Sequence, residues 1–598
     1  YMRLDFAARN NLELCETMRG RDKKGSLLWV LDHTRTPMGK RMISSWLELP
    51  LLSPAKITKR QNAVAELVKN HEMRENLGDS LKEIADLERL ITRAVYSTAN
   101  ARDLQALGNT LCRLKSVKSA VNGAKCRLLN ELQNDIDELG ELSAYIASAL
   151  VDEPPLTVRE GGLIRDGFDE RVDMLRSDMS GGKNIVSEIE ERERERTGVK
   201  KLRIVYNRVF GYLIEIPNSA NFEPPQDYYR RQTLTNCERY STDEVKQLEG
   251  RILGARDKLT ALEYEIFSTV RERAAGFAES IRKTAAAVAA LDTLWSFALT
   301  AYKNNYVCPE ITVDGKINIT EGRHPVVELL SDEPFVPNDT LLDNAANRCA
   351  IITGPNMAGK STYMRQTAII CIMAQIGSFV PAKSAKCSIV DAVFTRVGAS
   401  DDLTAGKSTF MVEMSEVASI LKYATKNSLL IIDEIGRGTS TYDGMAIARA
   451  VLEYLADKRK LGAKTLFATH YHELTALEGT LDGVTNYNIA AKKRGDNILF
   501  LRRIVRGAAD DSYGIEVASL AGVPHDVVKR AKAILKSLED DNPTVAPVIT
   551  SGESAQISFE STAKDDICSQ LAKVDINTFT PIEAMQKLNE LADKAKKL

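Results

Sequence analysis

A glycine-rich segment with one lysine and one serine is the part of this sequence best suited to bind phosphate. Residues 354–361, GPNMAGKS, follow an apolar run and precede an amphipathic stretch, which is the G-x-x-x-x-G-K-S pattern between a strand and a helix. Its backbone N–H groups can face phosphate oxygens, and the following helix adds its dipole. The segment predicts ATP binding by a P-loop. The predicted nucleotide-binding residues are Gly354, Pro355, Asn356, Met357, Ala358, Gly359, Lys360, Ser361 and Thr362.

Two adjacent carboxylates follow a second apolar run. Residues 428–440, SLLIIDEIGRGTS, indicate a buried strand that ends in Asp433 and Glu434. Asp433 suits holding Mg²⁺, either directly or behind its ligands, and Glu434 suits orienting or deprotonating the attacking water. The next run, KTLFATH, ends in His470, which a neighbouring strand end would place beside the γ-phosphate. The catalytic candidates are Lys360, Glu434 and His470, and the Mg²⁺ ligands are Ser361 and Asp433.

Length and composition set the frame for these motifs. A chain of 598 residues suggests about four domains. A net charge of −2 excludes a uniformly basic DNA-coating protein but leaves room for a local basic surface. The nine cysteines form no CxxC pair, which is typical of reduced thiols in the cytosol. No apolar run approaches the ~20 residues of a membrane span and no signal peptide opens the sequence, so we expect a cytoplasmic protein.

The apolar pattern changes twice along the chain. Residues 1 to about 180 have helical spacing, whereas Leu202, Ile204 and Tyr206 alternate with polar residues and predict a β-hairpin around Gly211. A long helix is then expected over about 242–273, roughly 50 Å at 1.5 Å per residue. This order indicates a β-rich insertion on the tip of a helical arm, with an ordinary α+β domain as the alternative.

The second half of the chain has the pattern of an α/β domain. Short apolar runs at 350–353, 429–432 and 465–468 alternate with helical stretches. A helix-turn-helix-like piece follows over 512–538, then a polar, proline-bearing stretch expected to be a linker. A last helix is predicted from Thr580, with Pro581 in its first turn and Glu583 completing a capping box.

Several motifs occur together in an order that is far more specific than any one of them. GPNMAGKST, STFMVEMSE, DEIGRGTSTYDG and FATHYHEL resemble the ATPase domain of the MutS family of bacterial DNA mismatch repair proteins. LDFAARNNLEL, ERERTGVKKLRIVYN, YYRRQTL and DDSYGIEVASLAGVP are similar to other segments of that family, so the resemblance covers nearly the whole chain. It implies an ATP-dependent repair protein that works as a nucleotide-switched clamp on double-stranded DNA.

The resemblance also implies a fold and its boundaries. The fold class is multidomain α and α/β, with a helical core or lever, an inserted β-rich clamp, an ABC-type P-loop ATPase domain and a C-terminal helix-turn-helix. The helix-turn-helix is expected to serve dimerisation rather than to read DNA. The expected segments are 1–180 (first part of the lever), 181–241 (clamp), 242–303 (returning lever helix), 304–508 (ATPase), 509–540 (helix-turn-helix), 541–572 (linker) and 573–598 (last helix).

Further site residues follow from the resemblance alone. Asn356 matches a position that senses the nucleotide state and joins the catalytic candidates, and Phe335 of EPFVPN matches the aromatic that stacks on adenine. Ser408 of KSTFM matches a serine that reaches the γ-phosphate of the opposite subunit, and the loop 436–441 matches one that crosses the dimer interface. The family pattern therefore predicts a homodimer with composite sites, or a tetramer of such dimers, that uses ATP and Mg²⁺.

DNA contact is expected in the clamp, where basic residues outnumber acidic ones. A solvated charged face would look similar on charge alone, and the resemblance favours contacts with the DNA backbone. The candidates are Lys200, Lys201, Arg203, Arg208, Arg230 and Arg231. The resemblance implies a MutL-type partner and a place with the bacterial nucleoid. A peptide that resembles a ligand of the replication sliding clamp consists of Gln556, Ile557, Ser558 and Phe559, although Glu560 replaces a usual apolar residue.

One expected part of the family pattern has no counterpart in this sequence. MutS proteins ordinarily carry a mismatch-recognition domain with a Phe-x-Glu motif and a connector domain before LDFAARNNLEL, and nothing here matches them. We expect a truncated chain without the mismatch reader. The alternative is a paralogue of the family that clamps branched recombination DNA. A chromosome-organising ABC-type ATPase fits less well, because the one SGG sequence, at 180–182, falls in an expected loop far from the carboxylates.

Overall fold

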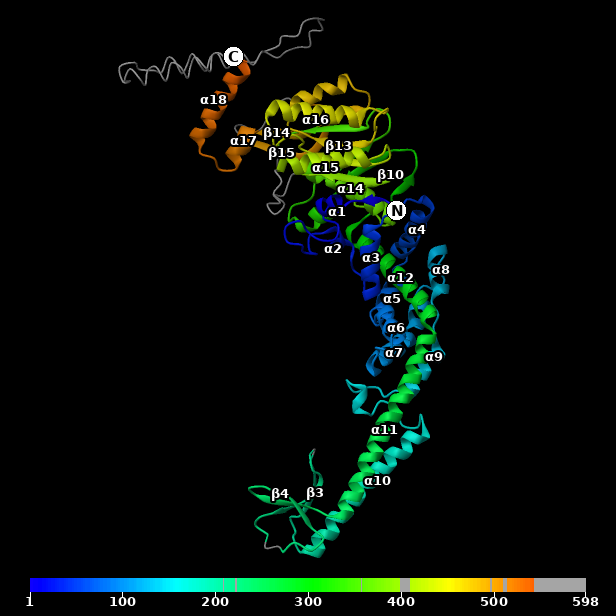
Figure 1. The fold of residues 1–598 in the computed structure, drawn as a ribbon. Helices are drawn as coiled ribbons and strands as arrows, with labels where there is room; N and C mark the ends of the chain where they lie inside the picture. The colour runs from blue at the N-terminus through cyan, green and yellow to red at the C-terminus, as the bar shows by residue number, and fades with distance from the viewer. Residues whose placement is uncertain are drawn as a thin grey trace, which may run out of the picture. The chain divides into compact units, whose positions relative to one another are not determined.

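The computed structural model describes residues 1–207, 209–220, 223–355, 358–397, 409–494, 497–508 and 514–541 (Figure 1). The chain is a multidomain protein of mixed helices and sheets. It divides into two compact units, Tyr1–Leu520 and Ala521–Leu598. In the second unit the described helix is α18 (His525–Asp541). The candidate site lies entirely in the first unit.

The first unit begins with a series of short helices, whose starts are set by capping residues. A capping box between Asn100 and Asp103 begins α7, and Thr36 with Pro37 begins α3. The buried carboxylate of Asp292 accepts the N–H of Arg35 and of Thr36, at 2.9 and 2.8 Å, and so fixes the start of α3. The helices are α1 (Phe6–Asn11), α2 (Leu27–Leu31), α3 (Pro37–Glu48), α4 (Pro54–Lys69), α5 (His71–Leu81), α6 (Leu87–Val95), α7 (Ala101–Ala120), α8 (Arg127–Asp135), α9 (Gly140–Ala149) and the 3₁₀ turn η1 (Val158–Glu160).

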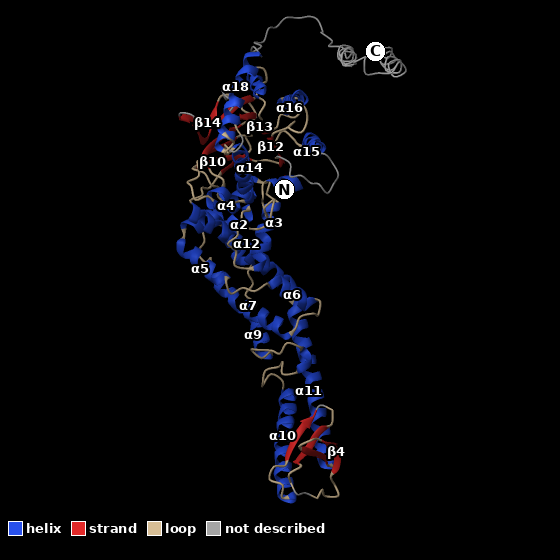
Figure 2. Cartoon of the chain, turned by 90° about the vertical axis from the view of Figure 1, so that its left-hand side faces the viewer, coloured by secondary structure: helices blue, strands red, loops and turns tan. Residues whose placement is uncertain are grey.

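Two long helices lie side by side and antiparallel, α10 (Glu170–Thr197) and α11 (Asp243–Gly276) (Figures 1 and 2). Ion pairs join them, among them Arg176 Nη2 to the fully buried Glu263 Oε1 at 2.6 Å. The chain then returns through α12 (Ala278–Asn304), after a break at Phe277. By length and composition α12 could cross a membrane, but 83% of its most apolar window is buried inside the protein. It is therefore the central helix of the helical core.

The segment 180–182, expected to be a loop, is helical and lies within α10. Each interior glycine costs a helix roughly 1 kcal/mol relative to alanine. The pairing of α10 with α11 outweighs this local preference. Because α10 continues to Thr197, the boundary expected at residue 181 falls inside a helix.

An antiparallel four-stranded sheet follows α10, in the order β2-β3-β5-β4. Its strands are β2 (Arg203–Asn207), β3 (Gly211–Pro217), β4 (Tyr229–Thr233) and β5 (Cys237–Ser241). The hairpin predicted from the alternating residues is β2–β3, with Gly211 at φ 75°. Charged residues of α10 fasten this sheet: Glu190 accepts the N–H of Ile204 at 2.7 Å, and the buried Tyr228 hydroxyl donates to Glu193 at 2.8 Å. The charged run of the sequence is therefore a contact surface.

The site is built on a seven-stranded sheet in the order β1-β11-β12-β13-β9-β14-β15. All neighbours are parallel except β15. A second sheet has the order β6-β10-β7-β8. The strands are β1 (Arg3–Leu4), β6 (Glu310–Thr312), β7 (Ile317–Gly322), β8 (Asn338–Leu342), β9 (Cys349–Thr353), β10 (Ser384–Ser388), β11 (Ala392–Arg396), β12 (Leu429–Asp433), β13 (Lys464–Ala468), β14 (Val484–Arg494) and β15 (Asn497–Arg506).

Helices cover both faces of this parallel sheet, which explains why its strands are apolar throughout. Alternate residues of β12 go to different cores: Leu429 and Ile431 pack with α14, and Leu430 and Ile432 with α15 and α16. The remaining helices of this unit are α13 (Pro325–Leu330), α14 (Lys360–Ile376), α15 (Thr409–Tyr423), α16 (Thr441–Ala456), the 3₁₀ helix η3 (His472–Gly479) and α17 (Gly514–Leu520).

Candidate functional site

Three neighbouring parallel strands, β12, β13 and β9, end at the same edge of the sheet. In the strand register, Asp433 of β12 pairs with Ala468 of β13, and Ala468 pairs with Ile352 of β9. The glycine-rich loop, the two carboxylates and His470 all follow directly. Ligands of open α/β sheets bind outside the carboxyl ends of the strands. The structure thus brings the three predicted motifs together.

The glycine-rich loop joins β9 to α14. Gly354 and Gly359 adopt φ values of 130° and 107°, which only glycine adopts without strain. Lys360 begins α14 with its side chain buried, and its Nζ donates to the carbonyl oxygen of Gly354. Burial lowers the pKa of Lys360, against the opposing charges of Glu434 and Asp433. A buried cation of this kind is suited to an anionic ligand.

Ser361 and Asp433 form the next contact. The serine hydroxyl donates to Asp433 Oδ2 at 2.5 Å. Asp433 is 4% exposed, and burial raises the pKa of its carboxyl. Its Oδ1 is buried without a hydrogen-bond partner among the described residues. A hydroxyl beside an unsatisfied carboxylate oxygen is a donor set that fits Mg²⁺. Among the residues that the structure describes, no group of three or more His, Cys, Asp or Glu is placed to hold a metal ion.

Glu434 lies in a strained backbone conformation, with φ at 58°. Its N–H donates to the carbonyl oxygen of Ala468 at 3.0 Å. Its Oε1 is 2.6 Å from His470 Nε2, and its Oε2 is 2.6 Å from Arg437 Nη1. The hydrogen bond with His470 is the main cause that lowers the pKa of Glu434 to about 2. This carboxylate is therefore ionised at any physiological pH.

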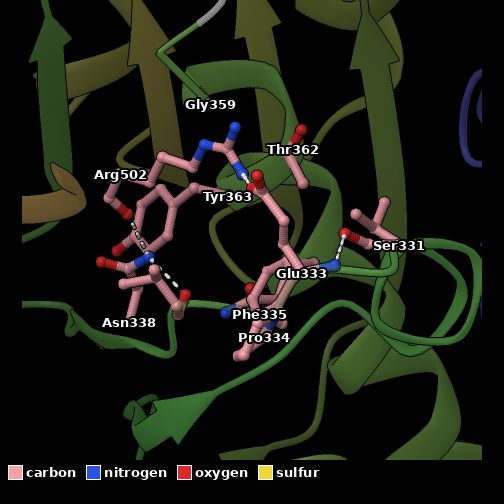
Figure 3. A pocket seen from close by; sticks show the side chains of 12 residues that line it. Ser331, Glu333, Pro334, Phe335, Asn338, Gly359, Thr362, Tyr363 and Arg502 are labelled. Atoms are coloured by element: carbon pink, nitrogen blue, oxygen red, sulfur yellow. Dashed lines mark hydrogen bonds and ion pairs between the residues drawn. The ribbon is translucent and has the colours of Figure 1, made fainter. Parts of the chain in front are cut away.

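A separate pocket of about 190 Å³ lies beside the glycine-rich loop (Figure 3). Phe335, predicted to stack on adenine, lines it together with Gly359 and Thr362. Arg502 of β15 also lines it, and its Nη1 is 3.4 Å from Glu333 Oε2. Asn338 holds Arg502 in place by donating to its carbonyl oxygen at 3.0 Å. Sequence reasoning missed Arg502, because β15 carries no recognisable motif.

Some predicted residues fall outside the described part of the chain. They are Asn356, Met357, Arg208, Ser408, the linker beyond residue 541 with the peptide 556–559, and the last helix 573–598 with Pro581 and Glu583. The predicted loop 436–441 is described, and its Gly438 packs against Phe410 at the start of α15. Pro355 and Ala358 flank the undescribed residues of the glycine-rich loop.

The DNA-contact candidates that the structure describes lie in and beside the small antiparallel sheet. Arg203 is bound to Glu215, with Nε to Oε1 at 2.9 Å, and Arg230 is paired with Glu238. Lys200 and Lys201 lie in the turn before β2 and Arg231 on β4. All three are exposed and form no ion pair with another described residue. Among the described DNA-contact candidates, these three cations are the ones without an ion-pair partner.

The chain is similar to known proteins along its whole length. The family model of MutS domain III matches residues 7–298, and that of MutS domain V matches residues 350–539. The DNA mismatch repair protein MutS of Ruminiclostridium cellulolyticum is 50% identical over 99% of this chain and 69% of its own length. That of Acetivibrio thermocellus is 50% identical over 100% and 69%, and that of Lachnoclostridium phytofermentans 52% over 91% and 58%.

These relatives are named for mismatch repair, so neither the recombination-type paralogue nor the chromosome-organising ATPase is favoured. The motifs at the strand ends and the two family domains lead to the same assignment. This chain belongs to the MutS family of DNA mismatch repair proteins.

Proposed function

We propose that this chain is an ATPase whose nucleotide state controls a grip on double-stranded DNA during mismatch repair. The observation that carries the proposal is the contact of Ser361 with Asp433 beside the Glu434–His470 pair, at the carboxyl edge of three adjacent strands. The names of the relatives support the repair role.

In this proposal the triphosphate lies along the glycine-rich loop and the start of α14. Lys360 leaves the Gly354 carbonyl to neutralise the β- and γ-phosphates, and Thr362 faces the phosphate next to the base pocket. The Phe335 ring supports the adenine. ATP can be held in this way by one subunit, so binding and hydrolysis can be measured separately.

Ser361 and Asp433 would hold Mg²⁺, because their oxygens fit that ion and Asp433 Oδ1 lacks another partner among the described residues. Bound there, the ion would supply charge to neutralise the phosphate oxygens. Its site needs few protein ligands, which is usual where phosphates complete the coordination.

Glu434 would position the attacking water. A carboxylate with a pKa of about 2 is a weak base at neutral pH, so we infer that it orients the water rather than removing its proton early. His470 and Arg437 fix the carboxylate from both oxygens. Hydrolysis is then most sensitive to the position of this one side chain.

We further propose a cytoplasmic dimer that contacts the DNA backbone through the sheet β2–β5. The exposed Lys200, Lys201 and Arg231 support this surface. The clamp, lever and helix-turn-helix boundaries given above are part of the proposal, as are the contributions of Ser408 and the loop 436–441 to the opposite site. A MutL-type partner and a sliding-clamp contact stay predictions.

The test is steady-state ATP turnover with and without a DNA duplex, together with sedimentation with and without ATP. The expected results are turnover that depends on Mg²⁺, a rate that changes with DNA, and a dimer. Lys360→Ala, purified in the same way, tests whether the turnover depends on this site. Turnover that persists in Lys360→Ala would contradict the site, and a rate indifferent to DNA would contradict the coupling.

A further inference from the structure

A buried carboxylate on α15, Glu413, touches two segments that meet beside the hydrolytic site. Its Oε1 accepts the N–H of Gly436 at 2.6 Å, and its Oε2 is 3.2 Å from Arg396 Nη2. Glu413 is 4% exposed. A buried carboxylate with these two partners is firmly fixed, because breaking either contact leaves a charge or a donor unsatisfied.

Gly436 follows Glu434 by two residues, and both of its backbone polar groups are held by side chains. Glu413 binds its N–H, and the Tyr471 hydroxyl donates to its carbonyl oxygen at 3.1 Å. Gly436 has φ at 87° and lies so close to α16 that an added Cβ would meet the Gly444 carbonyl oxygen at 2.4 Å. Its position is thus fixed from three directions.

The fixed glycine matters because Glu434 is strained. A non-glycine residue in the left-handed region costs roughly 1–2 kcal/mol. Such a conformation persists only where the surrounding structure enforces it. On one side of Glu434, β12 and the bond to Ala468 do so. On the other side of Glu434, the contacts of Gly436 with Glu413, Tyr471 and α16 hold the backbone in this conformation.

We propose that Glu413 is a positioning residue for ATP hydrolysis, acting through Gly436 to hold Glu434 where it orients the attacking water. This rests on the proposed ATPase function. Glu413 does not contact the nucleotide pocket residues Phe335 or Lys360 in any described bond, so it acts on turnover and not on ATP affinity.

Arg396 is the ion-pair partner of the buried Glu413 carboxylate. It is the last residue of β11, and its Nε also lies 3.3 Å from Glu416 Oε2, one turn further along α15. Glu416 shares Arg396 with Glu413 but has no bond to Gly436 among the described residues. Glu416 is therefore a matched control that tests the charge without the positioning contact.

The experiment compares Glu413→Ala, Glu413→Gln, Glu416→Gln and Tyr471→Phe in the full chain. It measures kcat and KM for ATP, the affinity for a fluorescent non-hydrolysable ATP analogue, and the melting temperature. We expect Glu413→Ala to lower kcat by about 10- to 100-fold, the range for a small misplacement of a reacting group. KM and the affinity for the analogue should stay within about twofold of wild type, because the contacts that bind ATP are unchanged.

The conservative variants separate positioning from general stability. In Glu413→Gln the amide oxygen can still accept the Gly436 N–H while Glu416 neutralises Arg396, so kcat should recover to within about threefold of wild type. Glu416→Gln should resemble wild type. Tyr471→Phe removes the other anchor of Gly436 without a buried charge, so kcat should fall with KM unchanged.

Each outcome decides the proposal. A folded Glu413→Ala with wild-type kcat, a Glu413→Gln as slow as Glu413→Ala, or a loss confined to KM would overturn it. If Glu413→Ala does not fold, the kcat of Tyr471→Phe decides instead. A wild-type chain without ATP turnover would instead refute the proposed function, so the two failures are distinguishable.

Discussion

The strained backbone of Glu434 leads to a prediction that couples stability to activity. Replacing Glu434 by glycine removes the carboxylate and also relieves the left-handed conformation, whereas alanine removes the same carboxylate and keeps the strain. Both variants lose the contacts with His470 and Arg437 equally. The difference in stability between the two variants therefore measures the cost of the left-handed backbone conformation at residue 434.

The magnitude follows from two opposing effects. Relief of the left-handed conformation stabilises the glycine variant by roughly 1–2 kcal/mol. The greater freedom of glycine in the unfolded chain costs roughly 0.4–1 kcal/mol. Glu434→Gly should thus be about 1 kcal/mol more stable than Glu434→Ala. The lost pair with Arg437 adds little to either variant, because the arginine is 68% exposed.

Hydrogen exchange of peptides covering β12 measures this difference locally, which avoids treating a multidomain chain as a two-state system. A stability gain of about 1 kcal/mol corresponds to roughly fivefold slower exchange. In both variants ATP turnover should fall by at least about 100-fold. Burial is the main cause that raises the pKa of Asp433, and the Glu434 charge adds to it. Removing that charge favours the ionised form of Asp433, so binding of a non-hydrolysable analogue should persist.

Two results would refute this reasoning. If Glu434→Gly exchanges as fast as Glu434→Ala, the left-handed conformation is not maintained in solution. If either variant keeps wild-type turnover, Glu434 does not position the water. Glu434→Gln, which keeps the shape and loses the charge, is the matched control for the contacts with His470.

The remaining predictions concern the pocket lined by Phe335 and one buried histidine. Phe335→Ala should raise KM for ATP by at least about fivefold with kcat unchanged, because stacking of a base on an aromatic ring contributes roughly 1–3 kcal/mol. A fall in kcat at constant KM would argue against a stacking role. Burial lowers the pKa of His324 to about 4, so its contribution to stability is present above pH ~6.5 and is lost as the pH falls towards 4. At pH 5 the free energy of unfolding should be about 2 kcal/mol lower than at pH 8. His324→Asn keeps an acceptor for the start of α13, so its thermal unfolding should not show this loss. Equal pH dependence in both proteins would contradict the assignment.

Local sequence information was enough for the part of the site that lies within single segments. The glycine-rich loop, the strand ending in Asp433 and the strand before His470 each consist of adjacent residues whose order dictates a strand, a turn and a helix start. Their convergence follows from parallel strands ending at one edge. The hairpin β2–β3 and the long helix α11 were predictable for the same reason.

Contacts between distant segments were not predictable. Arg502 reaches the pocket lined by Phe335 only because β15 adds to the sheet edge and Asn338 binds its carbonyl oxygen. Glu413 lies in a recognised motif, yet nothing in the sequence indicates that its partner is the N–H of Gly436. The helical glycines at 181 and 182 were misassigned because the pairing of α10 with α11 is a tertiary effect.

The edge strand β1 has a consequence for synthesis. Leu4 of β1 pairs with Val393 of β11. The two residues of β1 therefore join the edge of a sheet whose neighbouring strand is synthesised about 390 residues later. At translation rates of 5–20 residues per second, the ribosome needs about 20 to 80 seconds to supply that partner. The helices α1 to α12 are therefore synthesised while this short strand still lacks its neighbour. In a nascent chain that stalls before residue 392, β1 would lack the strand with which it pairs.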